Sequence, residues 1–427
     1  MIRLHKKAKT SNVYLGDNSI LPRNAFEWLL LPFIVGLLTL SHLQGFSKIM
    51  VVYGFGFAAL YALNILYFKK RPNIPPEILL YFLWITWSLT GMINAPDRDM
   101  YWQGLTTLLQ MAVLIIIIAG ITATYRSLSV VLLAILIGGL IVALSGFLSD
   151  EFELASEIES KTRATGLTNN ANGFAYSLLF VVFSSVYFFR RSSSSIWKIV
   201  LLGFFVFAFI GIVYSGSRKG FLGLLFFIAL FFIYYKSKYF LHKPLRSFLL
   251  FVSLFSIIYG GTNLVMSRTY LGKRMTYAKN EGSPMRVQMY KEGFELIQEY
   301  PFAGVGWNNY RVFSSFDKYS HSDYIEVATN TGLVGFILYF SVYLLLWLRI
   351  KRLKSRCRQT DSFFISFAKA AILTILMLGF GRPNISSKIT WCFLAALVGY
   401  SWSIEKFLRL NERREDLAYI HDSFSIQ

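Results

Sequence analysis

Hydrophobic residues fall in long runs along most of the 427-residue chain, and short polar segments separate these runs. A run of about 20 apolar residues can cross the hydrocarbon core of a bilayer as an α-helix. The pattern predicts about twelve spans, near residues 25–44, 48–68, 77–95, 103–123, 127–148, 172–190, 196–214, 219–236, 246–266, 331–349, 362–380 and 389–408. We therefore expect an all-α polytopic membrane protein, with residues 1–427 forming a single integral membrane domain.

Composition agrees with this pattern, because 55% of the residues are hydrophobic and only 15% are charged. The net charge of +20 does not indicate nucleic-acid binding, since Lys and Arg form short clusters between the spans instead of a basic stripe on a soluble face. The polar residues 1–24 precede a first apolar run longer than the core of a signal peptide, so we expect an uncleaved anchor.

Basic clusters also predict the orientation of the chain. They include Lys6 and Lys7, residues 69–71, 190–191, 236–238 and 349–358, and the C-terminal tail. All of them fall on one side if the spans alternate, and Lys and Arg mark the cytoplasmic side. We therefore expect a multi-pass protein of a bacterial inner membrane, with cytoplasmic termini and with the remaining loops in the periplasm.

The longest polar segment lies between the ninth and tenth predicted spans, at residues 267–330. Ser283 and Pro284 are typical of a helix start, and Pro301 ends the helix that follows. Its expected inner face carries Met285, Met289, Gly293, Leu296 and Tyr300. A glycine- and asparagine-rich turn follows at 304–309, and a second helix is expected to start near Ser320 or Ser322. A long polar excursion between spans is where we expect the chemistry.

Several arginines fall on the expected outer face, where the positive-inside rule does not explain them. Arg218 lies in a tight Gly/Ser turn, Arg286 opens the amphipathic helix and Arg163 precedes the sixth span. A guanidinium group binds two phosphate oxygens at once and stays charged, so all three are candidates for binding a diphosphate. For Lys219 and Lys388 we instead predict that the side chains reach out to lipid headgroups.

His321 is the candidate catalytic residue, because it is the histidine that begins a helix within the polar loop. Imidazole titrates near neutral pH and can take a proton from a sugar hydroxyl. Asp323 and Glu326 lie beside it and could orient it, but the simpler interpretation is that they are solvated charges on a helix surface.

The same loops show no metal-binding spacing and no glycine-rich nucleotide loop. Two cysteines, one in a basic loop and one in a span, suggest neither a disulfide nor a zinc site. We therefore expect no metal and no cofactor. Because nucleotide sugars are cytoplasmic, an outward-facing site favours a lipid-linked sugar donor.

Four motifs in the expected outer segments resemble those of the O-antigen ligase family. They are His321-Ser322 followed by Gly332-Leu333-Val334-Gly335, the RKGFL segment at 218–222, YPFAGVGWNNY at 300–310, and RATGLTNNANGFA at 163–175. The resemblance covers about residues 160–345. It implies an inverting, metal-independent glycosyltransferase that moves polysaccharide from undecaprenyl diphosphate onto the lipid A–core oligosaccharide, in lipopolysaccharide biosynthesis.

The resemblance also implies roles for single residues. His321 would be the general base, and Arg218, Arg286 and, more weakly, Arg163 would bind the diphosphate. Residues expected to support the site are Ser322, Tyr324, Glu326, Gly304 and Gly306.

Two alternatives to a ligase remain open at the level of sequence. O-antigen or exopolysaccharide polymerases and protein O-oligosaccharyltransferases share these motifs and differ in the acceptor. A transporter or lipid flippase is a different class, but transporters usually carry repeats and charged or broken helices near the midplane of the membrane. Most ionisable residues here lie at span ends, with Lys369 as the main exception.

Overall fold

The computed structural model describes residues 21–43, 45–69, 74–148, 163–242, 269, 271–272, 284–356 and 362–424, and every regular element in them is helical. The longer helices are α2 (Ala25–Thr39), α3 (Phe46–Tyr67), α4 (Pro76–Ser88), α5 (Arg98–Ile121), α6 (Tyr125–Leu148), α7 (Ala171–Arg191), α8 (Ser195–Tyr214), α9 (Arg218–His242), α12 (Pro284–Glu299), α13 (Tyr310–Phe313), α14 (Asp323–Arg356), α15 (Ser362–Gly379) and α16 (Lys388–Phe424). Short 3-10 helices are η1 (Leu40–His42), η2 (Leu89–Ile93) and η3 (Gly166–Thr168).

Nine helices among the described residues are long and apolar enough to cross a membrane. The protein is therefore an all-helical, multi-pass membrane protein, as the hydrophobic pattern predicts. The first predicted span is a helix of 15 residues followed by η1, and the last lies within α16. The span predicted at 246–266 lies outside the described residues. The count of twelve thus stays a prediction.

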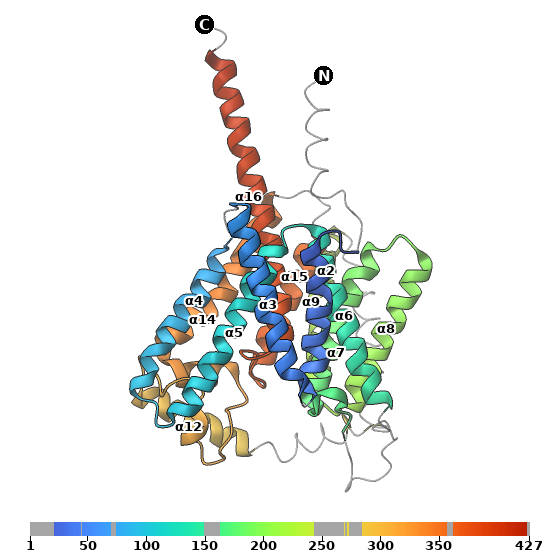
Figure 1. The fold of residues 1–427 in the computed structure, drawn as a ribbon. Coiled ribbons are helices and arrows are strands. Elements are labelled where there is room, and N and C mark those ends of the chain that lie inside the picture. The colour runs from blue at the N-terminus through green and yellow to red at the C-terminus, as the bar shows by residue number, and fades with distance from the viewer. Residues whose placement is uncertain are drawn as a thin grey trace.

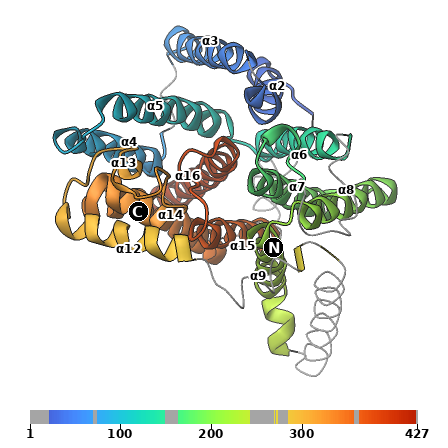
Figure 2. The same ribbon diagram turned by 90° about the horizontal axis from the view of Figure 1, so that it is seen from below.

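The spanning helices run side by side, and α12 lies across one end of them (Figure 1). Seen from that end, α16 is surrounded by α5, α6, α14 and α15, and the second half of α16 projects beyond the bundle at the opposite end (Figures 1 and 2). The turns that precede α5, α7, α9 and α16 lie at the α12 end, where Arg163 bonds to Ser215 and Lys219 bonds to Gly381 (Figure 1). This arrangement brings segments far apart in sequence to one place.

Local sequence signals explain where several helices begin. Asn24, Asp97, Asn170 and Ser194 each cap a helix by accepting a hydrogen bond from a backbone N–H of its first turn. Short polar side chains satisfy amide groups that have no partner within the helix. Two of these caps, on α5 and α7, lie at the α12 end of the bundle, where they fix the helix starts that border the candidate site.

A buried ion network ties three helices together away from that end. Arg349 of α14 forms ion pairs with Glu77 of α4 at 2.6 Å and with Glu405 of α16 at 2.9 Å, and the three side chains are at most 3% exposed. A buried charge is tolerated only with a partner, so these contacts fix how α4, α14 and α16 pack.

The predicted amphipathic helix is confirmed as α12. It starts at Pro284 and ends before Pro301, while Ser283 lies outside the described residues. Met289 and Leu296 are buried as expected, whereas Met285, in the first turn, is exposed.

Candidate functional site

Helix α14 is broken at Gly332, and the loop after α12 fits into the break. An unbroken helix would pair the Thr329 carbonyl with the Leu333 amide. Here the Thr329 carbonyl accepts from the Val305 amide at 2.8 Å, and the Leu333 amide donates to the Pro301 carbonyl at 2.8 Å. The loop therefore satisfies the two groups that the break leaves unpaired.

Glycines make this close fit possible. Gly332 has φ 67° and ψ −178°, a region that is essentially restricted to glycine, and a Cβ there would lie 1.9 Å from the Phe302 carbonyl oxygen. Gly304 and Gly306 also have positive φ and form the facing turn. The motif at 300–310 and the motif that begins at Gly332 thus form the two sides of one contact.

His321 lies in a tight turn just before α14, with a φ of 60° that is uncommon for a residue with a side chain. Glu326, in the first turn of α14, binds the residue that precedes His321. Its Oε2 accepts from the Ser320 amide and the Ser320 hydroxyl, both at 2.8 Å, while its Oε1 accepts from Asn330 at 3.1 Å. The backbone conformation of His321 is therefore set by a buried carboxylate.

Asp323 holds a second loop in the same way. Its Oδ1 accepts hydrogen bonds from the backbone amides of Asn384 and Ile385, in the loop at 380–387 that joins α15 to α16. Asp323 is 3% exposed and Glu326 is 7% exposed, so the interpretation of both as solvated charges was wrong. Each carboxylate is buried because it binds the amides of a loop that packs over the start of α14.

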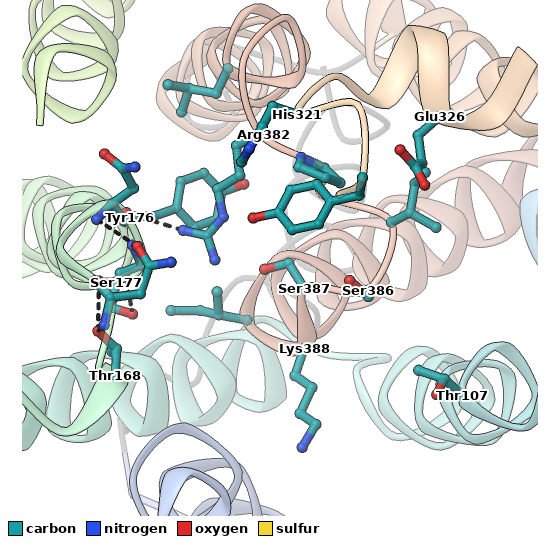
Figure 3. Close-up of a pocket in the computed structure, with 18 of the residues that line it drawn as sticks. Thr107, Thr168, Tyr176, Ser177, His321, Glu326, Arg382, Ser386, Ser387 and Lys388 are labelled. Atoms are coloured by element: carbon teal, nitrogen blue, oxygen red, sulfur yellow. Dashed lines mark hydrogen bonds between the residues drawn. The ribbon is translucent and has the colours of Figure 1, made fainter. Parts of the chain in front are cut away.

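A cavity of about 650 Å³ opens beside His321 at this end of the bundle. The Tyr319 and His321 rings lie together, with centroids 4.3 Å apart. Arg382, from the loop that Asp323 holds, points toward the same space in Figure 3. Its guanidinium lies 4.3 Å from the centre of the Tyr176 ring and donates to the Asn172 carbonyl at 3.2 Å.

Three further basic side chains line the cavity: Lys219, Lys388 and Arg311. The prediction that Lys219 reaches lipid headgroups was wrong, whereas the same statement for Lys388 stays a prediction. Lys219 donates a hydrogen bond to the Gly381 carbonyl, next to Arg382, and Lys388 begins α16 inside the bundle. Lys219 points inward because α9 starts at the wall of a polar cavity, where its ammonium group finds a carbonyl partner.

The predicted diphosphate-binding arginines lie around this cavity and do not line it. Arg218 and Arg286 are near enough to Lys219 for their charges to act on it, and Arg286 also acts on His321. Arg163 donates to the Ser215 carbonyl at 2.9 Å and to Asn172 Oδ1 at 3.2 Å, which links it to the residue that holds Arg382. Direct binding of diphosphate by these three arginines stays a prediction.

The remaining predicted residues support the backbone. The Ser322 carbonyl accepts from the Glu326 amide at 2.9 Å and so starts α14. Tyr324 stacks on Phe340 and Phe380 and donates to the Leu376 carbonyl at 2.9 Å. Across the residues that the structure describes, no three His, Cys, Asp or Glu side chains gather as a metal-binding group. Metal independence stays a prediction.

Sequence reasoning missed Arg382, Tyr176 and Asn172. A signal for Arg382 exists, since GRPN at 381–384 places an arginine in a short loop between two predicted spans on the expected outer face. Asn172 lies within the RATGLTNNANGFA motif, which does not distinguish it from its neighbours, and Tyr176 gave no signal because within a hydrophobic run it reads as an ordinary helix residue.

The environment of His321 favours the neutral imidazole. Burial, together with the positive charges of Arg286, Lys219 and Lys318, lowers the pKa of His321 from 6.5 to about 4. A neutral imidazole can accept a proton, so the group is in the form that a general base requires at neutral pH.

A first prediction concerns the pH dependence of turnover. The base is active when neutral, so a lowered pKa extends activity to lower pH, and the acid limb of kcat/KM should lie near pH 4, not near 6.5. Arg286→Gln removes a repelling charge, raises the pKa of His321 and moves this limb to higher pH. Rates measured between pH 4 and 8 test both statements. A limb near 6.5 that Arg286→Gln does not move would contradict them.

The fold and this cavity define a class: a multi-pass helical membrane protein with a histidine and several cations at one end of its bundle. Residues 203–340 match the family described as O-antigen ligase. This match agrees with the resemblance found in the sequence. The matched segment includes Arg218, Arg286 and His321. No curated protein matches the chain.

This match supports the O-antigen ligase and polymerase superfamily and a glycosyltransferase-like activity in O-antigen processing. It also suggests lipid-linked glycans as substrates. It does not separate ligases from polymerases.

Proposed function

We propose that the protein is an O-antigen ligase. It transfers polysaccharide from undecaprenyl diphosphate to the lipid A–core oligosaccharide, at the periplasmic face of a bacterial inner membrane. The observation that carries the proposal is the cavity that His321 shares with Lys219 and Arg382, at one end of a membrane bundle. A base beside a group of cations suits the attack of a hydroxyl on a sugar that leaves behind a diphosphate.

The proposed reaction is a single displacement. Neutral His321 takes the proton of the acceptor hydroxyl, and the oxygen forms a bond to the anomeric carbon of the donor sugar. The bond from that carbon to the diphosphate oxygen breaks, and its electron pair leaves with undecaprenyl diphosphate. Because attack and departure occur on opposite faces, the anomeric configuration inverts. The proton on His321 then passes to solvent.

Positive charge stabilises the leaving group. Negative charge develops on the leaving diphosphate, and fixed cations lower the energy of that state. In the proposal Arg218 and Arg286 bind the diphosphate, Arg163 supports their surroundings, and Lys219 and Arg382 approach it from the cavity wall. These charges would take the place of a divalent ion, so the proposed enzyme is metal-independent.

The acceptor decides between the ligase and its relatives. Purified protein in nanodiscs is given undecaprenyl-diphosphate glycan, with or without lipid A–core, in excess chelator, and the products are separated on a gel. Glycan attached to lipid A–core, formed only when that acceptor is present, supports a ligase. Longer lipid-linked glycan without lipid A–core means a polymerase, and no covalent product in either reaction favours a transporter.

A second prediction tests the diphosphate contact. Arg218→Lys keeps the charge but loses the two-pronged guanidinium, so we expect kcat/KM for the donor to fall about 100-fold. Arg98→Lys is the matched control, because Arg98 is exposed at the same end of the bundle and does not line the cavity. Equal donor kinetics in wild type and Arg218→Lys would remove Arg218 from the site.

A further inference from the structure

The cavity extends past His321 to a wall that the proposed chemistry does not use. In Figure 3, Thr168, Tyr176 and Ser177 lie on one side, Thr107 and Glu326 lie on the other, and His321 and Arg382 lie between them. The second side is formed by α5 and by the turn at 307–311, which contribute Gln103, Thr107, Asn308 and Arg311. We call these four residues the α5 wall.

The α5 wall is held rigidly. At Gly104 a Cβ would lie 2.5 Å from Trp307 Cδ1, so only glycine lets the turn approach α5 this closely. Asn308 donates to the Met100 carbonyl at 3.1 Å, and Asn309 exchanges two hydrogen bonds with the backbone of Asp97, at 2.9 and 3.1 Å. Polar groups on such a base are oriented before a ligand binds.

The chemistry of the α5 wall suits a glycan. Thr107 donates to the Gln103 carbonyl at 3.0 Å, which leaves the lone pairs of the Thr107 hydroxyl available. Among the described residues the side-chain amide of Gln103 has no hydrogen-bond partner. Amides and hydroxyls both donate and accept, as sugar hydroxyls do. Arg311 Nη2 is bonded to Asn308 at 2.6 Å, but its buried Nε has no hydrogen-bond partner among the described residues. An unpaired guanidinium N–H suits an anionic substituent.

The two sides of His321 differ in charge. Lys219 and Arg382 stand toward α7 and α9, and the charges of Arg218 and Arg286 reach Lys219. That side suits the diphosphate. The hydroxyl that attacks must come from the opposite face of the sugar, with the base beside it.

We propose that the α5 wall is the acceptor subsite: Gln103 and Thr107 bind hydroxyls of the acceptor glycan, and Arg311 binds an acidic substituent on it, a phosphate or a carboxylate. The inference rests on the proposed function, because it assigns the second substrate of the same site. Donor and acceptor then meet at His321 from opposite walls.

Steady-state kinetics with phosphate-bearing lipid A–core test the assignment. In Gln103→Ala and Arg311→Gln the KM for the acceptor should rise about tenfold, as for the loss of one good hydrogen bond, while the KM for the donor stays unchanged. Arg382→Gln should do the reverse. Thr106→Ala is the control for Thr107→Ala, since Thr106 is an exposed neighbour that does not line the cavity. A changed donor KM in the α5-wall variants, or an unchanged acceptor KM, would overturn the proposal.

Direct binding separates this inference from the proposed function. Fluorescent core oligosaccharide is titrated into wild type, Gln103→Ala and Arg311→Gln in nanodiscs, with and without prior removal of its phosphates. Weaker binding to both variants supports the subsite, even where no transfer is seen and the ligase function fails. If phosphate is the anion, its removal should weaken binding to wild type but not to Arg311→Gln. If a carboxylate is the anion, binding to wild type should be the same with and without the phosphates. Equal binding to all variants refutes the subsite.

Discussion

His321→Ala is expected to lower glycan transfer about 10²- to 10⁴-fold, the usual contribution of a general base. The alanine cannot take the proton of the acceptor hydroxyl, while the cations proposed to bind the diphosphate stay in place. The measurement is kcat with lipid-linked donor and lipid A–core, together with the Kd of the donor. We expect kcat to fall and the Kd of the donor to stay within a few-fold of wild type.

Donor affinity is the internal control for this variant. If His321→Ala lost donor binding as well, the turn would have collapsed and the result would report on folding. Glu326→Gln is then the second variant to measure, because its amide oxygen can still accept from Ser320 and so keep the turn that positions His321. Substantial turnover by a folded His321→Ala protein would exclude His321 as the base.

Gly332→Ala is expected to disrupt the protein most among single changes at residues that do not line the cavity. The new Cβ would lie 1.9 Å from the Phe302 carbonyl oxygen, and alanine at φ 67° and ψ −178° adds a backbone strain of about 1–3 kcal/mol. The loop at 301–306 must then leave the break in α14, and the Thr329 carbonyl and Leu333 amide lose their partners. We expect a lower thermal midpoint in detergent and loss of transfer.

Gly203→Ala is the matched control, because a Cβ at this position of α8 meets nothing within 4 Å. Alanine is also the better helix former, by about 1 kcal/mol, so this variant should be as stable as wild type or slightly more stable. A Gly332→Ala protein with wild-type stability and activity would show that the loop does not depend on the break.

The sequence predicted features that depend on neighbouring residues. Hydrophobic runs located the membrane helices, and Pro284 and Pro301 bounded α12. His321 was selected for its place in a polar loop, and it does line a cavity. These inferences succeeded because length, periodicity and proline act over one or two helical turns.

The features that could not be predicted from the sequence depend on packing between distant segments. Asp323 and Glu326 look like surface charges until the loops that carry Asn384 and Ser320 are placed over them. Lys219 looks like an interfacial lysine until α15 brings Gly381 beside it. The role of Arg382 likewise needs the contact of its loop with α7, more than 200 residues away.

The break in α14 has a mechanical consequence. Asp323 and Glu326 sit one turn apart in the short segment before Gly332, and each grips one of the two loops that face the cavity. A displacement of this segment would therefore move His321 and the loop that carries Arg382 together. The same loop, at 301–306, bonds to the Thr329 carbonyl on one side of the break and to the Leu333 amide on the other, so the segment and the span that follows it are joined through this loop. The position of His321 therefore depends on the loop after α12 as well as on α14.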